Sequence, residues 1–284
     1  SKEKEKMILV DNSQVVLSSI FAHTRGDTKS IDENLVRHMT LNSYKWIRNR
    51  FSSEYGELII CEDSSNCWRK NFFPLYKAAR KKSHENDDKD WRSIYDTLTR
   101  IRDEVRETFP YKNMKVDNCE ADDIIAVITR HYCVSEKIMI ISGDKDFQQL
   151  QTSSNVQQYS PIQKKMIVCE DPVRHLVEHV IAGDRSDGVP NILSDDDVFM
   201  VETKRQKPCG KKKIGSILED INNWKTTRNW ERNETLVDLS KIPVYIIDRI
   251  FDEWEKPIEG SRSKIFNYMV EHKLTNLIGD IQDF

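Results

Sequence analysis

The chain has 284 residues, 38% hydrophobic and 32% charged, so it is long enough for two domains around a sizeable core. Its 44 Lys and Arg residues nearly balance its 47 Asp and Glu residues, which excludes a uniformly basic nucleic-acid-binding protein. Its apolar runs are too short to cross a membrane, and its six Cys residues form no C-x-x-C pair, which favours a cytoplasmic protein with reduced thiols over a zinc ribbon.

Three short apolar runs predict strands that are buried on both faces of a parallel sheet: residues 7–10, 58–61 and 138–141. Apolar residues at helical spacing between 35 and 47, and again between 94 and 105, predict helices between these strands. This alternation is typical of an α/β fold in which ligands bind at the carboxyl ends of the strands. The carboxylates that follow the three runs are Asp11, Asp63, Asp144 and Asp146.

A basic segment follows the second strand. Residues 68–82 contain six basic residues and no acidic residue, and aromatic residues alternate with the charges. This composition suits a single nucleic-acid strand, through phosphate contacts and base stacking, although a solvated surface is the other interpretation. The residues of this segment that we expect to contact nucleic acid are Arg69, Lys70, Tyr76, Lys77, Arg80 and Lys81.

Further carboxylates lie in the sequence Glu120-Ala-Asp122-Asp123, which opens a predicted helix, and at Asp184 and Asp187 after a later helix. Acidic residues are favourable in the first turn of a helix without any further function. Together with the strand-end carboxylates, however, seven or more acidic groups would converge and repel one another unless cations compensate them. Oxygen ligands suit Mg²⁺ or Mn²⁺ rather than zinc, and two such ions about 4 Å apart form a centre that cleaves phosphodiesters.

The second half of the chain predicts a β-hairpin over 155–159 and 165–168, then an amphipathic helix over 173–181 that ends at Gly183. This helix contains an H-x-x-E-H motif, which also occurs in zinc peptidases. The apolar residues of the helix occupy the opposite face, so we interpret the motif as a solvated stripe. Its residues are His175, Glu178 and His179.

From about residue 214 the sequence predicts mainly helices, and we divide the chain into a catalytic α/β domain, 1–182, and a helical C-terminal domain, 183–284. A second basic block precedes these helices and predicts either a contact with the backbone of a nucleic-acid duplex or a disordered loop. Its basic residues are Lys204, Arg205, Lys207, Lys211, Lys212 and Lys213.

Five motifs occur in a specific order: Leu9-Val-Asp11-Asn-Ser13, Cys61-Glu-Asp63, Glu120-Ala-Asp122-Asp123, Ser142-Gly-Asp144-Lys-Asp146 and Gly183-Asp184-Arg-Ser-Asp187. In this order the chain resembles the 5′-nucleases of the flap endonuclease family, most closely the RNase H of T-even-type bacteriophages. The resemblance implies a PIN-like, mostly parallel central sheet flanked by helices, with a helical arch over 68–90. It also implies a helix–turn–helix-type element in the C-terminal domain that binds duplex DNA.

The resemblance further implies one Mg²⁺ site built from Asp11, Asp63, Asp122 and Asp144, with Glu120 beside it. It implies a second Mg²⁺ site from Asp146 and Asp187, together with Asp184. Lys77 and Arg80 would reach the scissile phosphate from the arch, and Tyr76 would stack on a base.

The implied activity is Mg²⁺-dependent 5′→3′ exonuclease and flap endonuclease cleavage of RNA primers and adjacent DNA during replication. The implied substrates are RNA–DNA and DNA duplexes with a 5′ flap or a nick. The implied protein is a monomer in the host-cell cytoplasm, with a single-stranded-DNA-binding protein on its C-terminal domain and a sliding clamp at residues 1–6. The alternatives that remain are a PIN-like single-strand ribonuclease and a junction-binding protein without activity.

Overall fold

The computed structural model describes residues 6–24, 32–80 and 90–284, with the side chains of 22–24 left out. A six-stranded sheet forms its centre, in the order β3-β2-β1-β4-β5-β6. The strands are β1 (Met7–Asp11), β2 (Glu57–Glu62), β3 (Lys112–Lys115), β4 (Ile138–Ile141), β5 (Val156–Ser160) and β6 (Lys165–Ile167). The first five are parallel to their neighbours, and β6 runs antiparallel to β5. The expected mostly parallel sheet is therefore confirmed.

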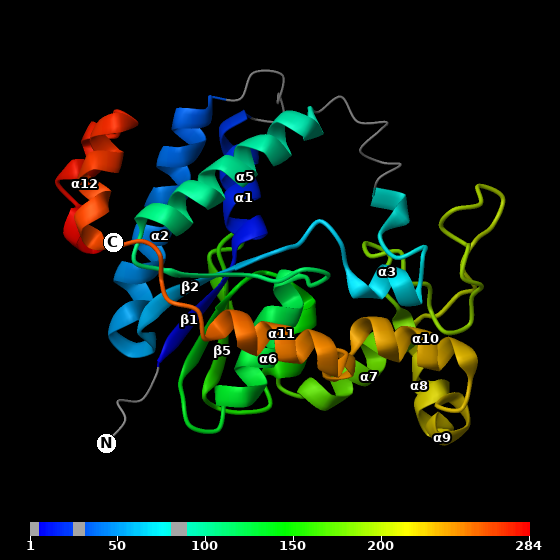
Figure 1. The fold of residues 1–284 in the computed structure, drawn as a ribbon. Coiled ribbons are helices and arrows are strands. Elements are labelled where there is room, and N and C mark those ends of the chain that lie inside the picture. Colours follow the sequence, from blue (N-terminus) through cyan, green and yellow to red (C-terminus); the bar gives the residue numbers. More distant parts are fainter. Residues whose placement is uncertain (1–5, 25–31, 81–89) are drawn as a thin grey trace.

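Helices cover both faces of the sheet (Figure 1). The core on one face contains residues of α1 (Asn12–Thr24), α2 (Glu33–Tyr55), α5 (Trp91–Thr108) and α12 (Arg262–Glu271), and the core on the other contains residues of α6 (Ala121–Tyr132) and α11 (Val244–Trp254). Within the first core, α12 packs against α5. Successive strand residues point to opposite faces. Accordingly Ile8 and Val10 of β1 join the first apolar core, whereas Met7 and Leu9 join the second. This explains why the predicted strands are continuous apolar runs.

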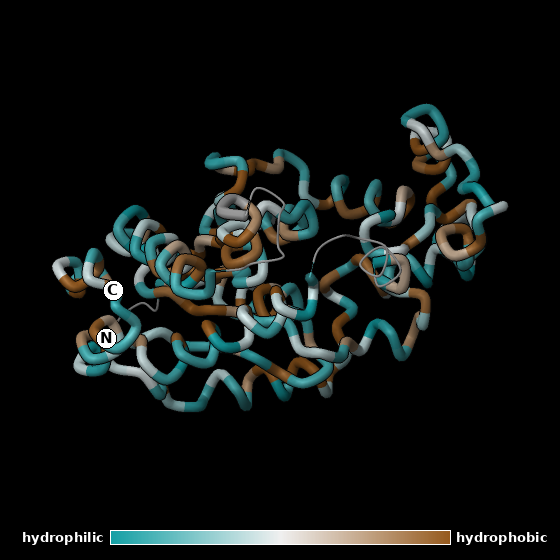
Figure 2. The backbone as a smooth tube through the Cα atoms, turned by 90° about the horizontal axis from the view of Figure 1, so that it is seen from above, coloured by the Kyte–Doolittle hydropathy of each residue, from teal (hydrophilic) through white to brown (hydrophobic). Residues whose placement is uncertain are grey.

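A third apolar core lies at one end of the molecule, where Cys67 and Phe73, on either side of α3 (Trp68–Phe72), and Tyr76 pack against four later helices (Figure 1). These helices are α7 (Pro172–Ala182), α8 (Lys211–Glu219), α9 (Ile221–Trp224) and α10 (Arg228–Val237). Figure 2 shows hydrophilic and hydrophobic segments alternating along the helices, as expected of amphipathic helices with one buried face. The described part of the basic segment therefore packs against the helices α7 to α10.

The last part of the chain packs back onto the two cores that flank the sheet. Ile265 of α12 and the final residue, Phe284, are fully buried in the first core, while Ile246 and Ile250 of α11 are fully buried in the second. The remaining short elements are η1 (Lys145–Leu150), η2 (Leu239–Lys241), α13 (Thr275–Ile278) and η3 (Ile281–Asp283). The helical C-terminal region is thus confirmed, and the boundary at residue 182 stays a prediction.

The helix predicted over 173–181 needs one correction, and the arch predicted over 68–90 lies only partly within the described residues. The helix predicted over 173–181 exists as α7 and ends at Gly183, whose φ of 68° suits glycine, but Val173 is 68% exposed and lies outside the apolar face. Of the predicted arch, the structure describes residues 68–80, which include α3 and a helical turn at 78–80, whereas Lys81 and the rest of 81–89 lie outside the described residues. Of the clamp contact expected at 1–6, residues 1–5 also lie outside them. Within the described part of the chain, no helix is long and apolar enough to span a membrane.

Candidate active site and metal centre

The parallel sheet brings its strand-end carboxylates to one edge. Asp11 is the last residue of β1, Asp63 follows β2, and Asp144 follows β4 and caps η1. Asp122 joins them from the first turn of α6. Because β1 lies between β2 and β4, this arrangement follows directly from the strand order. We call Asp11, Asp63, Asp122 and Asp144 the rim carboxylates.

The rim carboxylates hold too much negative charge for their surroundings. Burial, together with the charges of Asp63 and Asp144, raises the pKa of Asp11 to about 7. Burial and the charges of Asp144 and Asp11 raise the pKa of Asp122 well above its ordinary value. Both pKa shifts mean that the ionised carboxylates of Asp11 and Asp122 lack sufficient compensating charge. A bound cation would supply this charge and reduce the repulsion between the carboxylates.

Short hydrogen bonds fix two of the rim carboxylates. The Ser142 hydroxyl donates to Asp11 Oδ2 at 2.9 Å. The backbone N–H of Ala121 donates to Asp63 Oδ1 at 2.8 Å, and the Ser13 hydroxyl donates to Asp63 Oδ2 at 2.9 Å. The Asp63 contacts connect the end of β2 to the starts of α1 and α6. The carboxylates are therefore held in place by the fold.

A second acidic group lies beside the rim, where α7 packs against η1. Among the described residues, Asp146, His179 and Asp184 are the three metal-ligating side chains whose ligand atoms all lie within 4.8 Å of one another. Burial and the charge of Asp144 raise the pKa of Asp146 to about 7, although His179 opposes this shift. Despite its burial, Asp184 has a lowered pKa because of hydrogen bonds from His179 and Ser186 and the charge of Lys145.

Glu120 has a different environment from the rim carboxylates. It is the N-cap residue of α6, and its carboxylate contacts the Arg69 guanidinium at 2.9 Å and the Lys77 ammonium. Despite burial, the charges of Lys77 and Arg69 lower its pKa to about 2. Asp123, one turn into the helix, also pairs with Arg69, at 2.7 Å. Glu120 is therefore fully compensated from within the protein.

Asp187 connects the acidic groups to the basic segment. Its Oδ1 pairs with Arg80 at 2.5 Å, and its Oδ2 accepts a hydrogen bond from the Tyr76 hydroxyl at 3.1 Å and lies 3.8 Å from Lys77 Nζ. Despite burial, Glu120 and Asp187 raise the pKa of the Lys77 ammonium above its ordinary value. Lys77 and Arg80 are thus next to the acidic groups, and both are paired with carboxylates here.

Two residues expected to contact nucleic acid are buried. Arg69 is 2% exposed and is occupied by Glu120, Asp123 and the carbonyl of Leu236, so a direct contact with nucleic acid is not available to it. Tyr76 is 3% exposed, so its ring has no face on which a base could stack in this structure. Both side chains support the site from within. The aromatic and basic pattern of 68–82 could not distinguish these buried residues from exposed ones.

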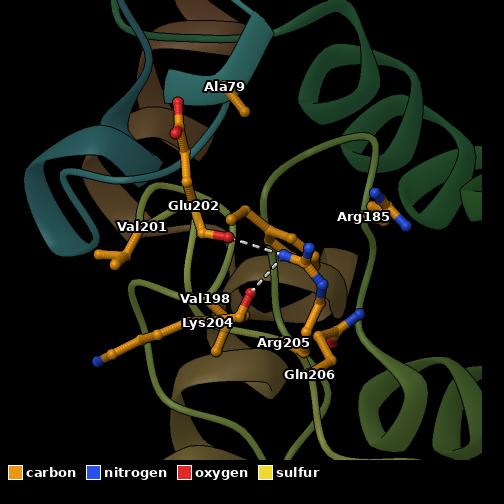
Figure 3. Close-up of a pocket in the computed structure, with 9 residues that line it drawn as sticks. Ala79, Arg185, Val198, Val201, Glu202, Lys204, Arg205 and Gln206 are labelled. Atoms are coloured by element: carbon orange, nitrogen blue, oxygen red, sulfur yellow. Dashed lines mark hydrogen bonds between the residues drawn. The ribbon is translucent and has the colours of Figure 1, made fainter.

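The remaining basic residues are mostly at the surface. Lys70, Arg205, Lys207 and the three lysines that open α8, Lys211 to Lys213, are exposed. A groove of about 680 Å³ has the basic lining residues Arg185, Lys204 and Arg205, which are drawn in Figure 3. Arg205 Nη1 donates to the carbonyls of Glu202 at 2.8 Å and Lys204 at 3.1 Å, while Lys204 Nζ pairs with Asp197 at 2.7 Å. At the start of the second basic block, Lys204 and Arg205 therefore have hydrogen-bond or ion-pair partners within the protein.

The interpretation of His179 as part of a solvated stripe is wrong. Its side chain is 5% exposed and lies 3.3 Å from Asp146 Oδ1 and 3.4 Å from Asp184 Oδ2. His175 instead contacts the carbonyl of Lys145 at 3.0 Å, and Glu178 pairs with Arg174. The H-x-x-E-H residues therefore have separate partners and form no common zinc site. Periodicity alone could not reveal that η1 covers this side of α7.

Comparisons with known proteins agree with this architecture. A family model described as the 5′-3′ exonuclease, N-terminal resolvase-like domain matches residues 6–178, and one described as the C-terminal domain of T4 RNase H matches residues 172–284. The Ribonuclease H of Enterobacteria phage T4 is 30% identical over 297 residues, covering 99% of this chain and 96% of that protein. The DNA polymerase I of Rhizobium leguminosarum is 26% identical over 208 residues, covering 67% of this chain and 20% of the polymerase.

Solved structures of bacteriophage T5 proteins have the same fold. One, co-crystallised with metal ions, matches at a TM-score of 0.58 and 17% identity over 88% of this chain and 98% of the T5 chain. A T5 flap endonuclease complex with DNA and metal ions matches at a TM-score of 0.58 and 16% identity, with the same coverage of both chains. From the two family models and the phage relative, we conclude that the chain belongs to the 5′-3′ exonuclease family and is a homologue of phage RNase H.

Proposed function

We propose that this chain is a divalent-cation-dependent 5′→3′ exonuclease and flap endonuclease that removes RNA primers and adjacent DNA during DNA replication. Its substrates are RNA–DNA and DNA duplexes with a nick or a 5′ flap. The observation that carries this proposal is the group of rim carboxylates, which lack compensating charge and lie beside a cationic segment. This combination suits the cleavage of a polyanion by bound cations.

The donors fit two Mg²⁺ ions, for which Mn²⁺ can substitute, because carboxylate oxygens are the ligands that these hard cations prefer. The rim carboxylates would hold the first ion. Asp146 and Asp187, with Asp184, would hold the second. When bound, such ions activate a water molecule for attack and stabilise charge on the phosphate oxygens. The products would carry a 5′-phosphate and a 3′-hydroxyl.

Lys77 and Arg80 would bind the phosphate next to the scissile bond. Their present partners, Glu120 and Asp187, hold the two cations within reach of the acidic groups. Arg80 is the more available of the two, because its side chain is 48% exposed whereas that of Lys77 is 19% exposed. In this proposal Arg80 exchanges Asp187 for a substrate phosphate, and Lys77 stays on Glu120 and supplies positive charge to the phosphate. Arg69 and Tyr76 act as positioning residues for Glu120 and Asp187.

Exposed basic residues would bind the nucleic acid outside the active site. Lys70, and Lys81 beyond the described residues, would contact the single strand near the arch. The groove of Figure 3 and the lysines at the start of α8 would contact duplex phosphates, which non-specific cationic side chains bind well. We assign the duplex-binding element to this region, between Asp187 and the end of α8.

The protein partners are part of the proposal. A single-stranded-DNA-binding protein would bind the C-terminal region, where Val244 and Tyr245 of α11 and Phe266 and Val270 of α12 are each about half or more exposed. Apolar side chains of this kind are common in protein interfaces. A sliding clamp would bind the N-terminal residues 1–6. The nuclease itself would act as a monomer in the host cytoplasm.

A cleavage assay on three matched substrates tests the proposed function. The substrates are a 5′-flap duplex, a nicked duplex whose 5′ strand is RNA, and a single strand, each incubated with Mg²⁺ or with a chelator. We expect cleavage of the first two in Mg²⁺, slow cleavage of the single strand, and none in the chelator. A preference for the single RNA strand would support a PIN-like ribonuclease instead. Binding without cleavage of any substrate would support a junction-binding protein.

A further inference from the structure

His179 occupies an unusual position between two acidic motifs. It lies on α7 and is 5% exposed, with Nδ1 3.3 Å from Asp146 Oδ1 and Nε2 3.4 Å from Asp184 Oδ2. Asp146 comes from η1, and Asp184 follows the Gly183 that ends α7. The imidazole therefore connects two segments that are 38 residues apart in the chain.

The hydrogen bonds on the Asp184 side indicate which nitrogen carries the proton. Asp184 accepts hydrogen bonds from the Ser186 hydroxyl at 2.6 Å and backbone N–H at 2.8 Å, and it pairs with Lys145 at 3.1 Å. His179 Nε2 completes this set as a donor to Asp184 Oδ2. In a neutral imidazole, a proton on Nε2 leaves a lone pair on Nδ1.

The Asp146 side of the ring lacks a hydrogen bond. Within the described residues, His179 Nδ1 and Asp146 Oδ1 are both buried atoms without a hydrogen-bond partner, although they face each other. Two buried acceptors that face each other are unfavourable unless something positively charged lies between them. A proton or a metal cation could fill this role.

The separation of the two atoms suits a metal ion. Two ligands bound at about 2.1 Å, at angles between octahedral and tetrahedral values, lie roughly 3.0–3.4 Å apart. The observed 3.3 Å falls in this range. Histidines that bind metals also commonly donate their other ring N–H to a carboxylate, which here is Asp184. Both the geometry and the outer hydrogen bond therefore have the form of a histidine ligand.

We propose that His179 Nδ1 and Asp146 Oδ1 together bind one divalent cation, with Asp184 orienting the imidazole from behind. This inference rests on the proposed function, because it adds a nitrogen ligand to the second of the two ions assigned there. It also specifies that Asp184 acts on that ion through His179 and not as a direct ligand. An imidazole ligand favours Mn²⁺, Co²⁺ or Zn²⁺ over Mg²⁺. The second site should therefore bind Mn²⁺ more tightly than Mg²⁺, while the rim carboxylates form an oxygen-only site.

Pulsed electron paramagnetic resonance of the Mn²⁺-loaded full chain tests this ligand directly. We expect a ¹⁴N coupling from a bound imidazole that changes to the ¹⁵N pattern when the histidines are ¹⁵N-labelled. The absence of a histidine coupling in the Mn²⁺-saturated wild-type chain would overturn the proposal. This measurement needs no variant, so it decides the question even if His179 cannot be replaced without loss of folding.

Three variants assign the coupling and exclude a purely electrostatic role. His179→Gln removes the ligand, His179→Lys keeps a positive partner for the carboxylates but cannot ligate as an ammonium, and His175→Gln is a control one turn away on the same helix. We expect the first two to lose the coupling and to bind Mn²⁺ at the second site about tenfold or more weakly, with the control unchanged. Full Mn²⁺ affinity in His179→Lys would show that the imidazole is a charge partner and would overturn the proposal.

Two experimental outcomes distinguish a failure of this inference from a failure of the proposed function. If the wild-type chain cleaves flap substrates with Mg²⁺ but shows no histidine coupling with Mn²⁺, the nuclease assignment stands and the nitrogen ligand is wrong. If the coupling is present but no substrate is cleaved with either metal, the nitrogen ligand stands and the nuclease assignment is wrong.

Discussion

Two carboxylates at the start of α6 lie two residues apart but have opposite environments. Glu120 contacts Arg69 of α3 and Lys77 of the turn that follows α3, and their charges lower its pKa to about 2 in spite of burial. Asp122 faces the rim, where burial and the charges of Asp144 and Asp11 raise its pKa well above the ordinary value. Basic side chains of the protein itself compensate the charge of Glu120, whereas the charge of Asp122 is not compensated to the same extent. The sequence motif Glu-Ala-Asp-Asp therefore combines a structural ion-pair centre with a carboxylate whose charge is poorly compensated, which is where we propose that metal binds.

The difference has a simple geometric cause. Glu120 is the N-cap of α6, and Asp123 closes a capping box with it, so both carboxylates are directed to the helix start and to Arg69. Asp122 lies between them on the first turn, where the charges of Asp144 and Asp11 at the neighbouring strand ends raise its pKa. Substitutions in the two regions should accordingly have different effects.

The largest expected effect is on catalysis and comes from Asp122→Asn. This change removes a ligand charge from the rim, and we expect turnover of a 5′-flap substrate to fall about a thousandfold or more, ~4 kcal/mol of barrier. Affinity for the substrate should be retained, because the basic residues are untouched. Asp117→Asn is the control, since Asp117 is exposed and precedes the motif. Unchanged turnover in Asp122→Asn would refute the rim assignment.

The next effect is on stability and compares two neighbours. Arg69→Met leaves Glu120 and Asp123 without their buried partner, and we expect urea unfolding to show a loss of about 3 kcal/mol or more. Lys70→Met changes an exposed residue and should alter stability by less than about 0.5 kcal/mol, while weakening nucleic-acid binding. If both variants are as stable as the wild type, the internal compensation of Glu120 is not what we describe.

The pH dependence of the folding stability of the metal-free protein tests the raised pKa of the rim carboxylate Asp11. The folded chain raises the pKa of Asp11 from 3.8 to about 7, so between these values it holds a proton that the unfolded chain has lost. Stability should therefore fall as pH rises, by roughly 2 kcal/mol between about pH 5 and pH 8 in a chelator. Thermal melts should show this slope reduced in Asp11→Asn and by saturating Mg²⁺. A stability that increases over this range would contradict the raised pKa.

The smallest effect is expected at the surface, far from both carboxylates of the comparison. Replacement of Lys211, Lys212 and Lys213 by Gln should weaken duplex binding about tenfold near 0.15 M salt. The dependence of log affinity on log salt should also become shallower, by about 0.9 for each phosphate that the variant no longer neutralises. Cleavage at saturating substrate should not change. An unaltered salt dependence would remove the start of α8 from the proposed duplex interface.

Much of the sheet could be predicted from the sequence, because β1, β2 and β4 are buried on both faces and form unbroken apolar runs. The strand β3 could not be predicted in this way, because its sequence, Lys-Asn-Met-Lys, is mostly polar at the edge of the sheet. Nor does the sequence indicate that α11 packs against β3 and α6, or that α12 packs against α5. This packing depends on contacts between distant segments, which local periodicity does not reveal.

The strand-end carboxylates could be predicted because the ends of neighbouring parallel strands must meet at one edge. The roles of Arg69 and Tyr76 could not, because composition does not distinguish a buried cation with two carboxylate partners from an exposed one. The burial of His179 could not be predicted for a related reason: it comes from η1, and only the tertiary structure brings η1 against α7.

The central claim is that the rim carboxylates are neutralised by divalent cations from solution. The most direct test is a calorimetric titration that counts the Mn²⁺ ions bound by the wild-type chain, Asp122→Asn and Asp117→Asn. We predict two ions for the wild type and for Asp117→Asn, and fewer or much weaker binding for Asp122→Asn. Absence of Mn²⁺ binding in the wild type, or identical binding in Asp122→Asn, would contradict the claim.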